Sequence, residues 1–396
     1  MRLCVVSFKE CWRDDAGRWL TSGGFPRQIA ALAAVFDELS LVLVQGLPQA
    51  GGIPLPSHAE VVALRKPVGT DTRRKLSVAA HAAYYLRALA RSIGEADVVH
   101  TPVPGDIPLL GMVVAAALHK RLFAIYMGSW VTNSHTTWMN RVTRGLMRRL
   151  AGGQNVMFAL GPLGSQTAPA PRMHSIFDTT VSRHELTTVQ PQLTRAPHAP
   201  LRLAYVGRLS PEKGLPHLLD AVSTLRADPA LTALVPHVTL IGDGPQRGDL
   251  VAQAERLHCD DIVQFRGQLD RDGVIRELMR ADVCVLPSLT EGFSKARLDA
   301  MVCGVPVITT GVGFGREIVG YDGERGWIVP PGDVPALAAA LRRVVTAPID
   351  WPNLRRRCRQ YVEGLTLEAW ADRIAELCAR QWNLSIVKGK LQSRVQ

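Results

Sequence analysis

The second half of the chain alternates short β-rich runs with segments of helical composition, and this alternation limits the available folds more than any other feature. The β-rich runs are Leu201–Val206, Val238–Ile241, Ile262–Phe265, Val283–Leu286 and Val305–Thr309. Between them lie the helical segments Leu215–Leu225, Gly248–Leu257, Asp272–Met279 and Ser294–Cys303. Strands separated by helices of this length form a parallel sheet with crossover helices. We therefore expect a doubly wound α/β domain in this half.

The first half repeats the alternation less regularly. Its expected strands are Leu3–Ser7, Leu41–Val44, Val61–Ala63, Val98–His100, Leu122–Tyr126 and Val156–Phe158. A segment with three prolines in fourteen residues, 187–200, separates the halves. A chain of 396 residues has room for two such domains. We expect domains at 1–190 and 200–364, an amphipathic helix at about 365–385, and a frayed tail after Asn383.

No segment has the character of a membrane anchor or a secretion signal. The longest uncharged apolar run, Ile107–Leu118, has 12 residues, whereas a membrane-spanning helix needs about 20. The run Leu3–Phe8 is too short for the core of a signal peptide. The seven cysteines are scattered and have no Cys-x-x-Cys spacing, so we expect neither a disulfide framework nor a zinc site. These features favour a cytoplasmic protein.

Two cations follow the first strand of the second half, in the motif Gly-Arg-Leu-Ser-Pro-Glu-Lys-Gly. Arg208 and Lys213 leave the carboxyl end of that strand just before a helix begins. Two cations beside a helix N-terminus suit a diphosphate. The alternative interpretation is a turn that carries two solvated side chains.

Glycines stand at several other strand ends. Gly242 and Gly244 lie in an Ile-Gly-Asp-Gly-Pro motif, Gly267 follows Arg266, and Gly24 precedes an apolar helix. Glycine lets the backbone approach a ligand closely, and backbone N–H groups ahead of a helix can bind phosphate. Each of these motifs is equally typical of an ordinary strand–turn–helix connection.

Two acidic residues follow the strand Val283–Leu286. Glu291 comes directly before a glycine, and Asp299 lies eight residues further on, in a helix. Two acids with this offset could hold two parts of one sugar nucleotide. Asp299 could instead pair with Lys295 or Arg297, as an ordinary helix acid does.

Taken in order, these segments resemble glycosyltransferase family 4, a family of GT-B glycosyltransferases. The resemblance rests on the motifs Gly-Arg-Leu-Ser-Pro-Glu-Lys-Gly, Gly-Asp-Gly-Pro, Phe-x-Gly and Pro-Ser-x-x-Glu-Gly-Phe, followed by Gly304–Ile308 and Gly326–Asp333. It covers residues 200–345 well, and the first half mainly at Gly23-Gly24. One such motif is weak, but six in register are highly specific.

The resemblance implies an α/β GT-B fold, with two Rossmann-like doubly wound lobes facing a central cleft. The N-terminal lobe would bind the acceptor and the C-terminal lobe the donor, and the last helix would cross back onto the N-terminal lobe. The implied activity is transfer of a sugar from a nucleoside-diphosphate sugar with retention of configuration. The nucleotide sugar is then a substrate, and neither a cofactor nor a metal ion is implied.

Site residues are carried over position by position. Arg208 and Lys213 would neutralise the donor diphosphate, and Glu291 would lie against the donor sugar, so these three are the predicted catalytic residues. Gly24 would meet a phosphate through its backbone. The other predicted donor-binding residues are Gly242, Gly244, Arg266, Gly267, Gly292, Phe293, Ser294 and Asp299.

The sequence departs from the family pattern at two positions. The second acid of the family's Glu-x7-Glu motif, which holds ribose hydroxyls, is the shorter Asp299 here. Met127 stands where relatives often place a histidine near the reacting centre, and Met cannot shuttle a proton. His100, Asp106 and Ser129 are the residues that could replace it as a base.

Other functions remain open at this point. A non-catalytic sugar-nucleotide-binding GT-B protein is one alternative, motivated by Met127 and Asp299, and a GT-B nucleotide-sugar epimerase is another. A phosphorylase would need a lysine for its cofactor, and none stands out. The run Gly311–Gly315 suggests a dinucleotide-dependent oxidoreductase, but its glycine spacing does not fit that fingerprint.

Positive charge is concentrated in the first half. Residues 1–200 hold 21 Lys and Arg against 12 Asp and Glu, whereas the rest holds 25 against 23. Two basic clusters contribute: Arg65, Lys66, Arg73, Arg74 and Lys75, and then Arg141, Arg144, Arg148 and Arg149. They could rest on anionic lipid at the inner face of the plasma membrane, which would suit a lipid-linked acceptor for cell-surface polysaccharide or lipopolysaccharide. A solvated basic face is the plain alternative, and no aromatic-and-basic module supports a nucleic-acid partner.

Overall fold

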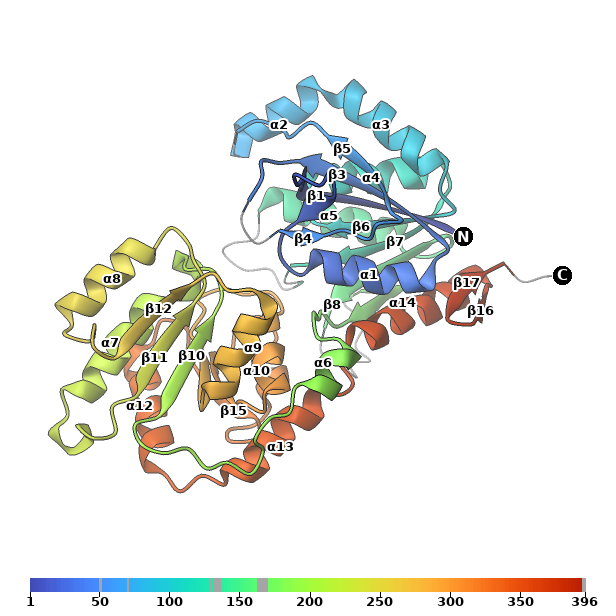
Figure 1. The fold of residues 1–396 in the computed structure, drawn as a ribbon. Coiled ribbons are helices and arrows are strands. Elements are labelled where there is room, and N and C mark those ends of the chain that lie inside the picture. Colours follow the sequence, from blue (N-terminus) through green and yellow to red (C-terminus); the bar gives the residue numbers. More distant parts are fainter. Residues whose placement is uncertain (50–51, 70, 129, 131–136, 162–169, 394–396) are drawn as a thin grey trace. The chain divides into compact units, whose positions relative to one another are not determined.

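The computed structural model divides the chain into two units (Figure 1). Unit 1 consists of Met1–Thr180 and Leu367–Gln396, and unit 2 of Val181–Thr366. The structure describes all residues except 50–51, 70, 129, 131–136, 162–169 and 394–396. The change of unit at Thr180 comes before the Pro-rich segment, so that segment lies within unit 2 rather than between two domains.

Unit 2 is built on a six-stranded parallel sheet. Its strands are β10 (Arg202–Val206), β11 (His237–Ile241), β12 (Val263–Gly267), β13 (Val283–Leu286), β14 (Val307–Thr310) and β15 (Gly326–Val329). They lie in the order β12-β11-β10-β13-β14-β15. The chain thus adds strands outward on one side of β10 and then returns to add them on the other side, which is the order of a doubly wound Rossmann sheet.

Four helices between these strands lie at the predicted helical segments: α7 (Leu215–Arg226), α8 (Arg247–Arg256), α9 (Arg271–Arg280) and α10 (Lys295–Val302). Unit 2 also contains elements that were not predicted: the helices α6 (Arg183–Thr188), α11 (Gly315–Val319), α12 (Val334–Thr346) and α13 (Trp351–Val362), and the short 3₁₀ turns η1 (Pro211–Lys213) and η2 (Pro229–Leu231). Strand β13 is buried along its whole length. A parallel strand covered on both faces is a continuous apolar run, which makes it easy to recognise in sequence.

Unit 1 carries a nine-stranded sheet. Its strands are β1 (Arg2–Arg13), β2 (Trp19–Thr21), β3 (Glu38–Gln45), β4 (Ile53–Pro54), β5 (Glu60–Leu64), β6 (Val98–Val103), β7 (Arg121–Tyr126), β8 (Asn155–Leu160) and β9 (Met173–Ile176). The parallel part runs β5-β3-β1-β6-β7-β8-β9. Beyond the parallel part, β1 continues into an antiparallel hairpin with β2, and β2 pairs with β4. This hairpin occupies the long stretch between the first strand and Gly23-Gly24.

Helices cover both faces of this sheet (Figure 1). They are α1 (Phe25–Val35), α2 (Asp71–Ala80), α3 (Ala82–Gly94), α4 (Asp106–Ala117), α5 (Trp138–Leu150) and α14 (Leu367–Trp382). Helix α4 contains the long apolar run of the sequence, and it is a core helix with Ile107, Met112 and Ala115 fully buried. No helix in the described part of the chain is both long enough and apolar enough to span a bilayer.

The end of the chain differs from the sequence-based expectation of a frayed tail. Residues Ser385–Val387 (β16) and Lys390–Gln392 (β17) form an antiparallel hairpin after α14. Leu391 is fully buried, and the Lys390 ammonium pairs with Asp37 at 3.0 Å. The expectation was wrong because two buried leucines, Leu384 and Leu391, anchor this short segment.

Candidate functional site

The point where the strand order of unit 2 reverses lies between β10 and β13. Ligands of doubly wound sheets bind at the carboxyl ends of the strands beside such a point. Two loops leave these ends here, 207–214 after β10 and 287–294 after β13. They contain all three predicted catalytic residues, so the topology brings together motifs that lie about 80 residues apart in the sequence.

The two loops are held together by their backbones. The Leu289 N–H donates to the Glu212 carbonyl at 2.8 Å. Gly214 has a φ of 66°, and a Cβ at this position would lie 2.3 Å from the Pro287 carbonyl oxygen. Only glycine combines this left-handed conformation with so close an approach, which explains the glycine that ends the first motif.

Lys213 and Glu291 form an ion pair across the loops. The distance from the Lys213 Nζ to the Glu291 Oε2 is 2.5 Å, and the Ser288 hydroxyl lies 3.3 Å from the same oxygen. Both charged side chains are mostly buried, with 21% and 14% of their surfaces exposed. Ser288 was not among the predicted site residues, and its position beside a strand-end motif was the signal that could have found it.

Arg208 is exposed and lies on the same loop as Lys213. Its carbonyl accepts a hydrogen bond of 2.8 Å from the Tyr205 hydroxyl, which fixes the backbone of the turn. Its guanidinium makes no ion pair with any residue that the structure describes. A free cation next to a paired Lys–Glu couple can neutralise an added anion without first losing a protein partner.

Gly242 and Gly244 pack against the Arg208 turn. A Cβ on Gly242 would lie 1.9 Å from the Gly207 carbonyl oxygen, and one on Gly244 would lie 2.3 Å from that of Leu209. The Leu209 N–H also donates to the Asp243 carbonyl at 2.9 Å. These glycines therefore have a structural reason to be present, because they allow the 242–245 turn to brace the loop that carries Arg208.

Arg266 and Gly267 end β12, next to β11. The Arg266 guanidinium pairs with Glu277 of α9 at 3.1 Å, and Glu277 also pairs with Arg280 at 3.2 Å. Gly267 has a φ of 67°, and its carbonyl accepts from the Gly242 N–H at 2.8 Å. The charge of Arg266 is thus balanced within unit 2.

Asp299 is buried, and its partner is neither Lys295 nor Arg297. Its carboxylate pairs with Arg271 of α9 at 2.7 Å, and the Arg271 Nε lies 2.7 Å from Glu185 of α6. Burial opposes the charge of Arg271, but these two carboxylates outweigh it and raise its pKa. The pairing with Arg271 could not be foreseen because the two residues lie on different helices.

The residues that follow Glu291 present mainly backbone groups, rather than side chains, to the candidate site. Phe293 is buried, with its ring centroid 5.8 Å from that of Phe314. Ser294 precedes α10 with a φ of 56°, a conformation that a serine adopts only under constraint. Gly292 touches a second loop, because a Cβ on Gly313 would lie 1.9 Å from its carbonyl oxygen.

Gly24 belongs to unit 1, whereas the other predicted site residues belong to unit 2. It is the N-cap of α1, and Pro26 lies in the first turn of that helix. The preceding Gly23 has a φ of 76°. The left-handed conformation explains the glycine at 23, whereas Gly24 has a φ of −78°, which any residue can adopt.

The residues named as substitutes for a base lie in different settings. His100 is buried in the middle of the sheet, stacked on Phe123 at 4.3 Å, and burial lowers its pKa to about 4. Asp106 begins α4 and pairs with Arg74 at 2.5 Å; burial alone would raise its pKa, but Arg74 lowers it. Ser129 lies outside the described residues. His100 is therefore neutral and enclosed at pH 7, and Asp106 is ionised.

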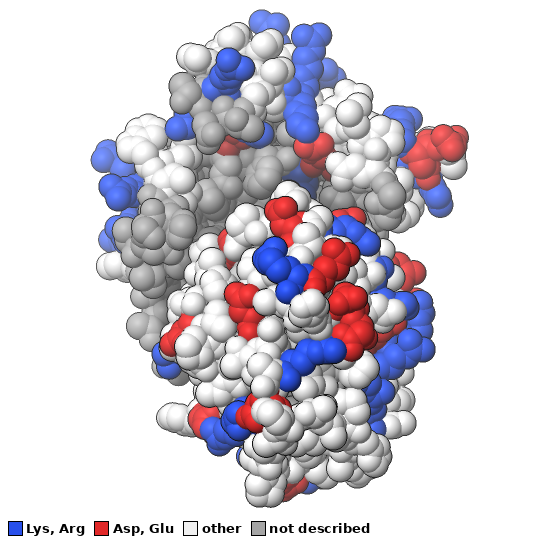
Figure 2. All heavy atoms as spheres, turned by 90° about the vertical axis from the view of Figure 1, so that its left-hand side faces the viewer, with Lys and Arg blue, Asp and Glu red and all other residues white. Residues whose placement is uncertain are grey.

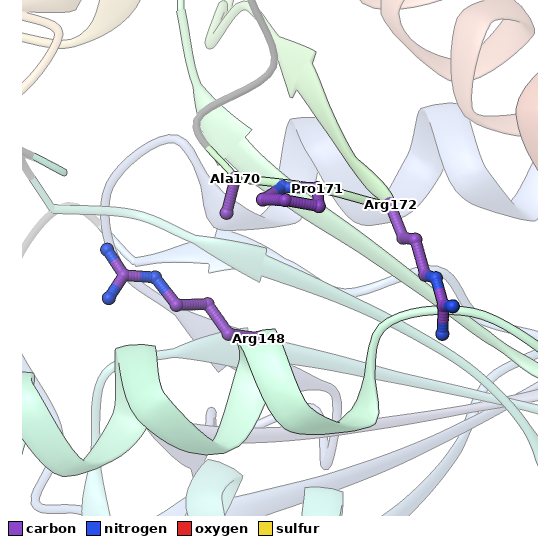
Figure 3. Close-up of a pocket in the computed structure, with 4 residues that line it drawn as sticks. All are labelled: Arg148, Ala170, Pro171 and Arg172. Carbon is purple, nitrogen blue, oxygen red and sulfur yellow. The ribbon is translucent and has the colours of Figure 1, made fainter.

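A cavity of about 520 Å³ in unit 1 lies away from the ligand-binding edge (Figure 3). Arg148, Ala170, Pro171 and Arg172 line it. Arg148 lies in the last turn of α5, just before β8, and Arg172 directly precedes β9, so the cavity is at the amino ends of these strands. The two guanidinium groups extend in opposite directions in Figure 3 and do not converge on one ligand. Elsewhere in the described chain, no three His, Cys, Asp or Glu side chains are grouped so as to hold a metal ion.

A family model described as "Glycosyl transferases group 1" matches residues 200–347. These residues belong to the glycosyl transferases group 1 family. The matched segment, the group 1 domain from here on, contains every predicted site residue except Gly24. The group 1 domain thus coincides with most of unit 2.

Curated relatives match the same region. A glycogen synthase of Mycobacterium tuberculosis is 36% identical over 183 residues, which is 46% of this chain and 43% of the relative. A mannosyltransferase named MMP alpha-(1->4)-mannosyltransferase, from Mycolicibacterium hassiacum, is 33% identical over 43% of this chain and 42% of its own. The chain therefore matches less than half the length of these relatives, mainly around the group 1 domain.

Solved structures match nearly the whole chain. HepE of Anabaena, solved in complex with UDP, gives a TM-score of 0.66 at 18% identity and covers 96% of this chain and 100% of its own. Sucrose-phosphate synthase from Thermosynechococcus elongatus gives 0.68 at 21% identity, covering 97% of this chain and 99% of its own. The chain has the GT-B fold, with the group 1 domain as its C-terminal Rossmann-like part.

Proposed function

We propose that this protein transfers a sugar from a nucleoside-diphosphate sugar to a glycan or lipid-linked acceptor. The observation that carries the proposal is the position of Arg208, Lys213 and Glu291 at the point where the strand order of unit 2 reverses. A sheet of this type binds its ligand there. Two cations and a carboxylate match a ligand with an anionic diphosphate at one end and a sugar at the other.

The chemistry places negative charge where these cations lie. The bond between the anomeric carbon and the diphosphate oxygen breaks, and an acceptor hydroxyl forms the new bond to that carbon. The proton of the hydroxyl passes to the departing phosphate oxygen. Arg208 and Lys213 stabilise the charge that develops on the diphosphate, as a preorganised oxyanion site does. When both events occur on one face of the sugar, configuration is retained and no carboxylate nucleophile is needed.

The other predicted residues complete the donor site in this proposal. Glu291 orients the sugar, and Asp299, held in place by its ion pair with Arg271, accepts from ribose hydroxyls. Arg266 and Gly267 border the base, and the backbone of 292–294 meets the phosphates. Gly242 and Gly244 act through the turn that they support. The nucleotide sugar is a substrate, so no cofactor enters the reaction.

Two findings support a cell-surface glycan as the product. AmsK of Erwinia amylovora, a relative 32% identical over 39% of this chain, is named for amylovoran biosynthesis. In unit 1, an apolar and basic surface lies where helices follow the carboxyl ends of β5 and β7. Its described residues are Val68, Arg73, Lys75, Leu76, Trp138 and Arg141. We name this the basic–apolar surface and propose that it holds a lipid-linked acceptor at an anionic membrane.

Thermal stabilisation by nucleoside diphosphates tests the donor site. HepE is also solved with UDP-glucose, so UDP is the first probe, followed by GDP and ADP. A ligand at 100 times its Kd stabilises a protein by about 2.7 kcal/mol, which raises the melting temperature measurably. If none of the three diphosphates binds at millimolar concentration, the proposal fails.

Substitution of Glu291 tests the activity itself. We expect Glu291→Ala to keep the fold and to lower the rate of sugar transfer by about 10²–10³, the typical effect of removing one transition-state contact. The exposed Glu255→Ala on α8 is the matched control and keeps the wild-type rate. Equal transfer by both variants would contradict the site. Binding without transfer would favour the non-catalytic binder, and release of free nucleotide without an acceptor would favour the epimerase.

A further inference from the structure

Arg297, in the first turn of α10, is fully buried although it carries a charge. Its Nε donates to the Thr309 hydroxyl at 3.2 Å, and its two Nη groups donate to the carbonyls of Phe293 and Val312, both at 3.3 Å. No carboxylate of the described residues forms an ion pair with it. A buried charge whose hydrogen bonds all go to neutral groups is costly, so its presence calls for a reason.

The two carbonyls belong to two loops at the same edge of the sheet. Phe293 lies in the loop after β13 that contains Glu291, and Val312 lies in the loop after β14 that contains the Gly311–Gly315 run. These loops touch, because a Cβ on Gly313 would lie 1.9 Å from the Gly292 carbonyl oxygen. The Thr310 hydroxyl also donates to the Ser288 carbonyl at 2.6 Å. Arg297 therefore joins the Glu291 loop to the 311–315 loop from the buried side.

The peptide geometry then sets the direction of two N–H groups. In a trans peptide the C=O and the following N–H point in opposite directions. Since the carbonyls of Phe293 and Val312 point down to Arg297, the N–H groups of Ser294 and Gly313 point away from the core. Both residues have positive φ, 56° and 60°. Neither N–H meets an acceptor within the part of the chain that the structure describes.

We propose that Arg297 is a positioning residue for the donor diphosphate, which it presents with the outward N–H groups of Ser294 and Gly313 as one anion-binding pair. The proposal rests on the proposed function of the Arg208, Lys213 and Glu291 site. It gives the Gly311–Gly315 run a role in that site, because a side chain at 313 would close the gap between the loops. The guanidinium also adds a fixed positive charge behind the pair.

The charge is present at neutral pH. Burial lowers the pKa of Arg297 to about 10, and the carboxylates of Glu291 and Glu317 limit the shift. A group with this pKa is almost fully protonated at pH 7. Arg297 thus keeps both its charge and its three donors under physiological conditions.

Binding of phosphate-bearing probes to Arg297→Met tests the inference without an activity assay. The probes are inorganic pyrophosphate, UDP and uridine, measured by calorimetry or by ligand-observed NMR. We expect the variant to stay folded and to bind pyrophosphate and UDP at least tenfold more weakly, with unchanged affinity for uridine. Arg316→Met, which removes an exposed cation from α11 next to the same loop, should leave all three affinities within about twofold.

Three outcomes would overturn the inference. They are equal affinities of Arg297→Met and wild type for pyrophosphate, a parallel loss for uridine, and failure of the wild type to bind pyrophosphate. If Arg297→Met does not fold, Arg297→Lys is the variant to measure. Lysine keeps the positive charge but cannot donate to both the Phe293 and the Val312 carbonyl, so UDP binding by Arg297→Lys with wild-type affinity would contradict the proposed positioning role. Binding of UDP to the wild-type protein is measured separately, and it tests the proposed function independently of the role of Arg297.

Discussion

Asp282 is a buried carboxylate of unit 2 that is surrounded by three arginines. It directly precedes β13 with 1% of its side chain exposed, and it forms ion pairs with Arg195, Arg202 and Arg355. It also accepts from the Arg202 N–H at 2.9 Å. Arg195 lies in the Pro-rich segment that precedes β10. The carboxylate therefore fastens a segment of linker-like composition to the sheet that carries the candidate site.

Replacing Asp282 by Ala should destabilise unit 2 by about 3–5 kcal/mol, because Arg355 would be left buried without a compensating charge. Urea unfolding followed by fluorescence measures the change. The exposed Asp260→Ala serves as the control and should change stability by less than about 0.5 kcal/mol. A similar midpoint for both variants would mean that solvent reaches the Asp282 cluster.

At the scale of elements, the candidate site is a set of braced turns. The 242–245 turn supports the Arg208 loop, the Arg208 loop is bonded to the Glu291 loop, and Arg297 joins the Glu291 loop to the 311–315 loop. Glycine is required at these contacts because any larger residue would place its Cβ against the backbone of the neighbouring turn. Side chains that bear the chemistry are thus held by backbone contacts between neighbouring strand ends.

Two glycine substitutions separate this packing from a general effect of alanine. Gly242→Ala places a Cβ against the Gly207 carbonyl at a φ of 135°, and should lower the free energy of unfolding by at least about 2 kcal/mol. Gly248→Ala in α8 meets nothing within 4 Å and should raise it by about 1 kcal/mol. Thermal melts of the two variants should shift in opposite directions.

The sequence predicts some of these elements much better than others. The β13 range Val283–Leu286 was predicted as observed, because a strand buried on both faces is a continuous apolar run. The short strands β2 and β4 have no such run and were not predicted. The contact of Lys213 with Glu291 follows from motif order and sheet topology. By contrast, the Arg271–Asp299 pair and the Arg297 clamp depend on the direction of side chains between helices and loops, which periodicity does not reveal.

At the scale of the whole molecule, the two units differ in how their charged side chains are distributed. Acidic and basic side chains are interspersed over the face of unit 2 in Figure 2. Unit 1 holds both basic clusters, but several of their members have internal roles: Lys66 pairs with Glu10, Arg74 with Asp106, and Arg144 is buried against Tyr126. Exposed cations remain at the basic–apolar surface, where the Lys75 ammonium lies 5.9 Å from the Trp138 ring centroid.

Vesicle sedimentation tests the membrane proposal. We expect binding to vesicles with anionic lipid at low salt, and release at high salt. Replacing Lys75 and Arg141 by Gln should lower the partition coefficient about fivefold per charge, since each cation near such a surface contributes about 1 kcal/mol. Arg276→Gln on α9 of unit 2 is the control. If vesicle binding does not depend on anionic lipid, the membrane proposal fails and the basic clusters are a solvated surface.

The division of unit 1 between both ends of the chain has a consequence for biosynthesis. Trp370 and Ile374 of α14 are buried in unit 1, and the Trp382 indole N–H donates to the Gln154 carbonyl at 3.0 Å. A ribosome that has released Thr366 has therefore delivered all of unit 2, while the first domain to emerge still lacks part of its core. Co-translational maturation should run in reverse order, with the Met1–Thr180 portion waiting as a partly assembled intermediate until Leu367–Gln396 arrives.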